Sequence, residues 1–91
     1  MDKETSMIIK EFYRRFPDKT VLYVKDPKDE SYYIVNAVPS SKSKNTILDS
    51  LFAVDKKTYK ILRVFQPIQN INAYKNARTI YEKDGVKNVR K

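Results

Sequence analysis

The chain has 91 residues, which suffices for one small domain with a single core but not for two. Hydrophobic residues make up 41% of the chain and aromatic residues 12%, so the charged fraction of 33% describes the hydrated surface of a folded domain. We therefore expect residues 1–91 to form a single domain, with the basic tail at 86–91 as a candidate flexible extension. The net charge at pH 7 is +8.

Missing residue types exclude several kinds of chemistry. The chain has no histidine and no cysteine, which excludes histidine-based triads, ordinary zinc sites and thiol chemistry. Gly85 is the single glycine, whereas nucleotide-binding loops need several. The carboxylates at 26–30 have the composition of a turn and lack the ligand spacing of a calcium loop. We therefore predict no catalytic residue, no metal site and no cofactor, and a protein that is not an enzyme.

No apolar run approaches the ~18 residues that a membrane span needs, and residues 1–10 lack the apolar stretch of a signal peptide. We expect no membrane span and a cytoplasmic location. The alternative is an extracytoplasmic protein whose leader has been removed. An abundance of Lys, Asn, Ile and Tyr resembles the composition of proteins from AT-rich bacteria or their phages.

The first predicted element is a helix over residues 2–16. Its apolar residues recur at spacings of three and four, as an amphipathic helix requires: Ile8, Ile9, Phe12, Tyr13 and Phe16. Pro17 ends the helix, because a residue that precedes proline is disfavoured in the helical conformation.

Short runs rich in β-branched and aromatic residues follow, and we predict four strands, at 20–25, 32–38, 47–54 and 59–65. Turn-forming residues at 26–31 and 55–58 join them into two hairpins, and the longer loop at 39–46 connects the hairpins.

A second helix is predicted from residue 70 or 72 to residue 84, because Ala73, Ala77, Ile80 and Tyr81 share one helical face and Gly85 suits a helix C-cap. The element order is therefore α-β-β-β-β-α. Strands grouped between helices favour an α+β fold, with a four-stranded antiparallel sheet packed against the helices.

The turn at 55–58 predicts a register for the second hairpin in which the numbers of paired residues sum to 113. The predicted core face then carries four pairs: Val54 with Tyr59, Phe52 with Ile61, Ser50 with Arg63, and Leu48 with Phe65. Leu51 pairs with Leu62 on the opposite face, which is unusually apolar for a solvent side. We single out this face as a candidate interaction surface: Ile47, Leu51, Lys60, Leu62 and Val64. Three interpretations stay open: coverage by the C-terminal helix, a dimer or partner surface, and scattered exposed apolar residues.

These observations favour a small non-catalytic binding module that acts through protein–protein contacts, with an unknown protein or a second copy of the chain as partner. The alternative is a basic nucleic-acid-binding module, because the charge of +8 favours phosphate contacts. Four tyrosines are candidates for stacking on bases: Tyr32, Tyr33, Tyr59 and Tyr74.

Residues 51–62 resemble the hairpin of PepSY-like and related cystatin-like domains, in which a strand ends in Val-Asp, turns through polar residues and returns. That family usually has a glycine after the turn threonine, where this chain has Tyr59. The resemblance implies a non-catalytic module, often extracytoplasmic, that contacts peptides or peptidases. In size, charge and its central sheet the chain is also similar to RelE-like ribosome-dependent ribonucleases, which implies an enzymatic variant of the nucleic-acid hypothesis.

Overall fold

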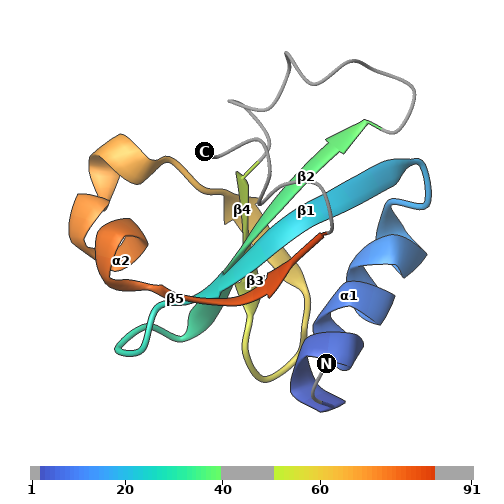
Figure 1. The fold of residues 1–91 in the computed structure, drawn as a ribbon, viewed down its shortest axis with the longest axis horizontal. Coiled ribbons are helices and arrows are strands. Elements are labelled where there is room, and N and C mark those ends of the chain that lie inside the picture. The colour runs from blue at the N-terminus through green and yellow to red at the C-terminus, as the bar shows by residue number, and fades with distance from the viewer. Residues whose placement is uncertain (1–2, 40–50, 84–91) are drawn as a thin grey trace.

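The structure is a computed structural model that describes residues 3–39 and 51–83, and Figure 1 shows its ribbon. The elements in chain order are α1 (Lys3–Arg15), β1 (Lys19–Asp26), β2 (Tyr32–Pro39), β3 (Leu51–Asp55), β4 (Ile61–Val64), the 3₁₀ turn η2 (Pro67–Gln69), α2 (Ile71–Asn76) and β5 (Arg78–Glu82). The strands form one sheet in the order β4-β3-β2-β1-β5, and every neighbouring pair is antiparallel. The predicted α+β class is confirmed, whereas the predicted count of four strands is wrong.

Helix α1 covers one face of the sheet and forms the larger core with it. Ile8 and Phe12 of α1 are fully buried among valines of β1 and β2 and Val54 of β3. The Phe12 ring lies 5.2 Å from Phe16 and 5.6 Å from Phe52, measured between centroids. Because the buried residues recur at positions 5, 8 and 12, the predicted helical stripe is the side of α1 that meets the sheet.

The predicted C-terminal helix is wrong over most of its length. Within the described part of this predicted helix, Ile71–Asn76 alone is helical; Ala77 is extended, with φ −71° and ψ 138°, and Arg78–Glu82 is strand β5. The predicted C-cap, Gly85, lies outside the described residues. Strand β5 pairs with β1 and covers the edge of β1 that β2 leaves open. Three residues of β5 have side chains that favour strands: Thr79, Ile80 and Tyr81. Pairing with β5 also satisfies the N–H and C=O groups along the edge of β1, which a helix at these positions would leave to water.

The register predicted for the β3–β4 hairpin is also wrong. The observed pairs are Phe52 with Val64, Ala53 with Arg63, and Val54 with Ile61, so a β-bulge leaves Leu62 without a partner in the ladder. The turn closes at Asp55, whose backbone N–H donates to the Lys60 carbonyl over 2.8 Å, and the loop is therefore 56–59 instead of 55–58.

The opposite face of the sheet carries a second, smaller core. Its buried residues are Tyr32, Ile34, Leu51, Ala53 and Phe65. Phe65, predicted for the face that α1 covers, lies here, because the bulge in β4 changes the alternation of side chains along the strand. Half-buried Tyr74 of α2 packs against this cluster, so the η2–α2 segment lies over one end of this face.

Among the helices that the structure describes, none is long and apolar enough to cross a membrane.

Candidate functional site

The five residues of the predicted interaction surface do not share one face. Leu51 is 7% exposed and belongs to the second core, whereas Leu62 and Val64 of β4 are 47% and 53% exposed. Lys60, at the end of the turn, is exposed as well, and Ile47 lies outside the described residues. The predicted surface is therefore reduced to its β4 side, where no described strand pairs with the outer edge of the sheet.

Exposed apolar side chains gather in a short part of the chain that begins at this edge, residues 62–71, which we name the 62–71 segment. Ile68 in η2 is 87% exposed and Ile71, the first residue of α2, is 49% exposed. With Leu62 and Val64, these make four of the five large hydrophobic residues exposed in the described part of the chain; the fifth is Met7, at 36%. Single exposed apolar residues are normal on a protein surface, but a group of them is typical of a contact surface.

A cleft of about 240 Å³ lies in the same segment. Six residues line it: Arg63, Val64, Phe65, Gln66, Gln69 and Asn70. Pro67 shapes the cleft because its fixed φ suits the first position of the 3₁₀ turn, which reverses the chain after β4. Two backbone hydrogen bonds hold the turn, from Gln69 to the Gln66 carbonyl (3.0 Å) and from Asn70 to the Pro67 carbonyl (3.1 Å). The residues after β4 thereby fold back toward it.

Three aromatic rings pack against one another next to this cleft. Phe65 packs between Tyr32 and Tyr74, with ring centroids 5.8 Å and 6.3 Å away. The Arg63 guanidinium carbon lies over the Tyr32 ring, 5.2 Å from its centroid. The Tyr74 hydroxyl hydrogen-bonds to the Tyr23 hydroxyl over 2.7 Å, which ties α2 to β1.

The Tyr32 hydroxyl links the sheet to the cleft, because it accepts a hydrogen bond from Nδ2 of the cleft residue Asn70 over 3.1 Å. Burial raises the pKa of Tyr32 above its usual value and Glu30 raises it further, while Arg63 and the Asn70 hydrogen bond lower it less. Tyr32 therefore stays neutral at pH 7, and its hydroxyl serves to orient Asn70.

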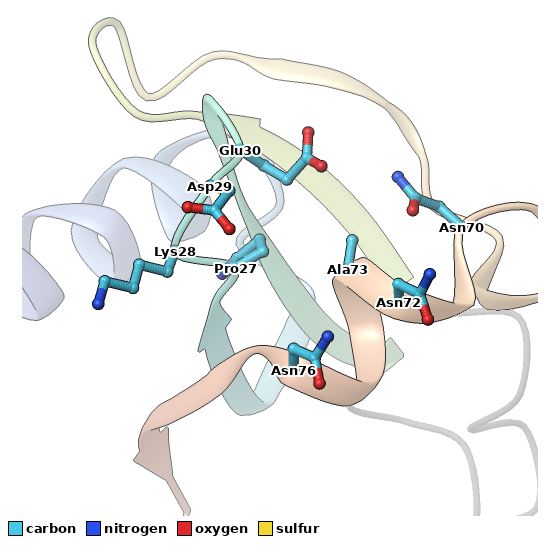
Figure 2. Close-up of a pocket in the computed structure, with 8 residues that line it drawn as sticks. All are labelled: Pro27, Lys28, Asp29, Glu30, Asn70, Asn72, Ala73 and Asn76. Carbon is cyan, nitrogen blue, oxygen red and sulfur yellow. The ribbon is translucent and has the colours of Figure 1, made fainter.

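Asn70 also lines a second, smaller cleft of about 150 Å³. Figure 2 shows its two walls: residues 27–30 of the β1–β2 turn, and Asn70, Asn72, Ala73 and Asn76 at α2. Carboxylates of Asp29 and Glu30 stand on one wall and carboxamides on the other, and Pro27 and Ala73 add apolar surface. No group of three or more metal-binding side chains of the His, Cys, Asp or Glu type occurs within the described ranges.

The remaining ionic contacts near these turns stabilise the fold. Lys56 Nζ lies 2.7 Å from Asp26 Oδ1, donates to the Pro27 carbonyl over 3.1 Å and sits 5.4 Å above the Tyr33 ring. Its backbone N–H donates to the Ser31 carbonyl, so this lysine joins the two hairpin turns. Burial raises the pKa of Tyr33, with a hydrogen bond to Glu4 as the next cause, and the hydroxyl remains protonated.

The tyrosines predicted to stack on bases are mostly engaged within the fold. Tyr32 and Tyr33 are 4% and 1% exposed, so neither offers a ring face to a nucleotide. Tyr59 is half-buried against the first core, and Tyr74 is half-buried against the second.

The sequence-based prediction missed the cleft residues Gln66, Gln69 and Asn70 and the exposed Ile68 and Ile71 of the 62–71 segment. Ile68 directly follows Pro67, Ile71 stands between Asn70 and Asn72, and neither fits the apolar face of the predicted helix. Apolar residues that belong to no predicted core are the signal that could have indicated this surface.

No protein-family model, curated protein or solved structure matches the chain. The function is therefore argued from the 62–71 segment itself.

Proposed function

We propose that this protein is a non-catalytic binding module that contacts another protein through its 62–71 segment. One observation carries the proposal: four of the five large hydrophobic side chains exposed in the described part of the chain lie within these ten residues. Keeping Ile68 in water at 87% exposure contributes nothing to folding, and burial of such a side chain against a partner is favourable by roughly 1.5–3 kcal/mol.

The chemistry of the cleft supports a protein ligand. Gln66, Gln69 and Asn70 each carry an amide that can donate and accept hydrogen bonds, which suits the N–H and C=O groups of a peptide backbone. Protein contact surfaces usually combine an apolar centre with a polar rim, and the apolar side chains of this segment stand beside polar amides. An extended segment of another protein is therefore the ligand that this surface fits best.

The resemblance to PepSY-like domains supports the same class of function. Tyr59 has a φ of 62°, the left-handed conformation that glycine adopts readily, and it occupies the position where that family usually has glycine. The preceding Asp55 accepts hydrogen bonds from Thr58 N over 2.7 Å and Thr58 Oγ1 over 3.0 Å. We include a non-catalytic module of this kind in the proposal.

The nucleic-acid hypothesis rests on the net charge of +8 and on the four tyrosines, and its RelE-like variant rests on size, charge and a central antiparallel sheet. Among the residues that the structure describes, the buried Tyr32 and Tyr33 contribute no stacking surface to them. Submicromolar binding of a labelled oligonucleotide at physiological salt would favour these alternatives over a protein partner.

A selection of random peptides on the immobilised protein tests the proposal. Enriched peptides are expected to lose about tenfold or more in affinity when Leu62→Lys or Ile68→Lys is introduced, because each change places a charge in the apolar contact. Met7→Lys is the matched control, since Met7 is exposed on α1 outside the segment. Equal affinity for all three variants would refute the proposal, and circular dichroism confirms that each variant is folded.

A further inference from the structure

Arg63 is the charged residue of the 240 Å³ cleft, and its geometry suits an anion. The guanidinium carbon lies 5.2 Å from the centroid of the Tyr32 ring, while the side chain as a whole is exposed. A guanidinium that lies over an aromatic ring keeps the N–H groups at its rim available for hydrogen bonding. The ion pairs of Arg14 with Glu11 and of Lys56 with Asp26 do not include Arg63, and no carboxylate within residues 3–39 and 51–83 forms an ion pair with it.

The other polar residues of the cleft lack negative charge. Gln66, Gln69 and Asn70 are neutral amides. Because Asn70 donates its Nδ2 to the Tyr32 hydroxyl, its orientation is fixed and its carbonyl oxygen remains to accept from a ligand N–H. Asp29 and Glu30 line the adjoining cleft, which shares Asn70 with this one.

We infer that this cleft receives an acidic side chain of the partner, which pairs with Arg63 while neighbouring aliphatic residues of the same extended segment pack on Val64 and Ile68. The inference rests on the proposed function and specifies its ligand. Arginine and carboxylate groups are complementary in shape, since two parallel N–H groups can meet two oxygens. A net charge of +8 also favours an acidic partner over a second copy of the chain.

A side chain fits this arrangement better than a carboxyl terminus does. Val64 lines the cleft, and the exposed Leu62 and Ile68 are the chain neighbours of its lining residues Arg63 and Gln69. A partner segment that uses these residues continues past Arg63 in each direction, so its chain does not end there.

Three short peptides test the inference by titration of the ¹⁵N-labelled protein, with amide chemical shifts as the readout. The first is acetyl-Ser-Val-Glu-Val-Ser-amide, the second has Gln in place of Glu, and the third is the Gln peptide with a free carboxyl terminus. The Glu peptide is expected to bind about fivefold more tightly than its Gln counterpart, the upper range for an exposed ion pair. In Arg63→Gln the ratio falls to about one, while Arg78→Gln, a change at an exposed arginine on β5, leaves it unchanged.

Each other outcome overturns the inference in a recognisable way. Equal affinity of the Glu and Gln peptides, with shifts at 62–71, removes the acidic preference and leaves the proposed function standing. Tightest binding of the free-terminus peptide shows that the carboxylate is terminal. Sedimentation that shows a dimer, with loss of dimer in Arg63→Gln, identifies a second copy as the occupant. Absence of any shift at 62–71 with all three peptides refutes the proposed function as well.

Discussion

The backbone at Tyr59 is left-handed, and we therefore predict that a glycine at this position gives a more stable protein than an alanine, the reverse of the usual order. Tyr59 is the one residue other than glycine with positive φ among the described residues, at 62°. Its N–H donates to the Asp55 carbonyl over 2.9 Å, and the Asp55 carboxylate accepts from Lys57 N and Thr58 N, so the loop cannot relax without losing these bonds. We therefore expect Tyr59→Gly to be more stable than Tyr59→Ala.

Two opposing effects set the size of this difference. A side chain with a Cβ atom costs roughly 1–2 kcal/mol in the left-handed conformation, which glycine avoids. Glycine in turn costs about 0.4–1 kcal/mol more than alanine through the greater freedom of the unfolded chain. Both variants lose the packing of the half-buried ring on the first core, so this loss cancels in the comparison. The net advantage of glycine is about 1 kcal/mol.

Urea denaturation followed by circular dichroism measures the difference. For a domain of this size the dependence of the unfolding free energy on urea is about 1–2 kcal/mol per M, so the glycine midpoint should lie about 0.5–1 M above the alanine midpoint. Lys57→Gly and Lys57→Ala are the control pair, because Lys57 lacks positive φ and alanine should be the more stable there. A midpoint for Tyr59→Ala equal to or above that of Tyr59→Gly would refute the strain argument.

Three further predictions concern stability. Phe12→Ala should lower the unfolding free energy by about 3–5 kcal/mol, because the ring is 1% exposed in the first core, and a loss below about 1 kcal/mol in urea denaturation would contradict the packing. Lys56→Ala should cost about 1 kcal/mol through the lost contacts with Asp26 and Pro27, whereas Lys57→Ala should change the urea midpoint little. Hydrogen bonds from Thr58, and then Lys57, lower the pKa of Asp55, so its stabilisation is present above the ordinary aspartate pKa and is lost as pH falls through the lowered value. Urea midpoints at pH 7 and pH 3 should therefore differ less in Asp55→Asn than in the natural protein, and an equal difference would show that the carboxylate is not responsible.

The sequence predicts those parts of the fold that depend on local patterns. Apolar spacing of three and four residues marks α1, and Pro17 ends it, because both effects act within one helical turn. The β1–β2 hairpin follows from two apolar runs around the turn-forming residues 26–31. Such elements need no knowledge of distant residues.

The sequence-based predictions of secondary structure and strand register are wrong where they depend on residues far away in the chain or on an irregular backbone. Ala73, Ala77 and Ile80 fit a helical face, but the open edge of β1 is more than fifty residues away and turns 78–82 into β5. The register of the second hairpin depends on a positive φ at Tyr59 and on a bulge that leaves Leu62 unpaired. Neither feature follows from the order of apolar residues.

The candidate surface was predicted in part for the same reason. Leu62 and Val64 lie in β4 whichever register the hairpin adopts, and both are exposed, as the prediction of a surface there requires. Leu51 was assigned with them through a pairing that the bulge abolishes. The roles proposed for Ile68 and Arg63 depend on the 3₁₀ turn, which brings residues after the sheet back to the end of β4.

Amide hydrogen exchange of the protein, alone and with a peptide selected on it, tests the central claim most directly. A ligand that occupies the 62–71 segment should slow exchange at the amides of β4, η2 and the start of α2, and leave α1 and β5 unchanged. The protection should disappear in Ile68→Lys and persist in Met7→Lys, because only the first residue lies in the segment. Protection that maps to α1 or β5 instead, or that Ile68→Lys does not alter, would contradict the account.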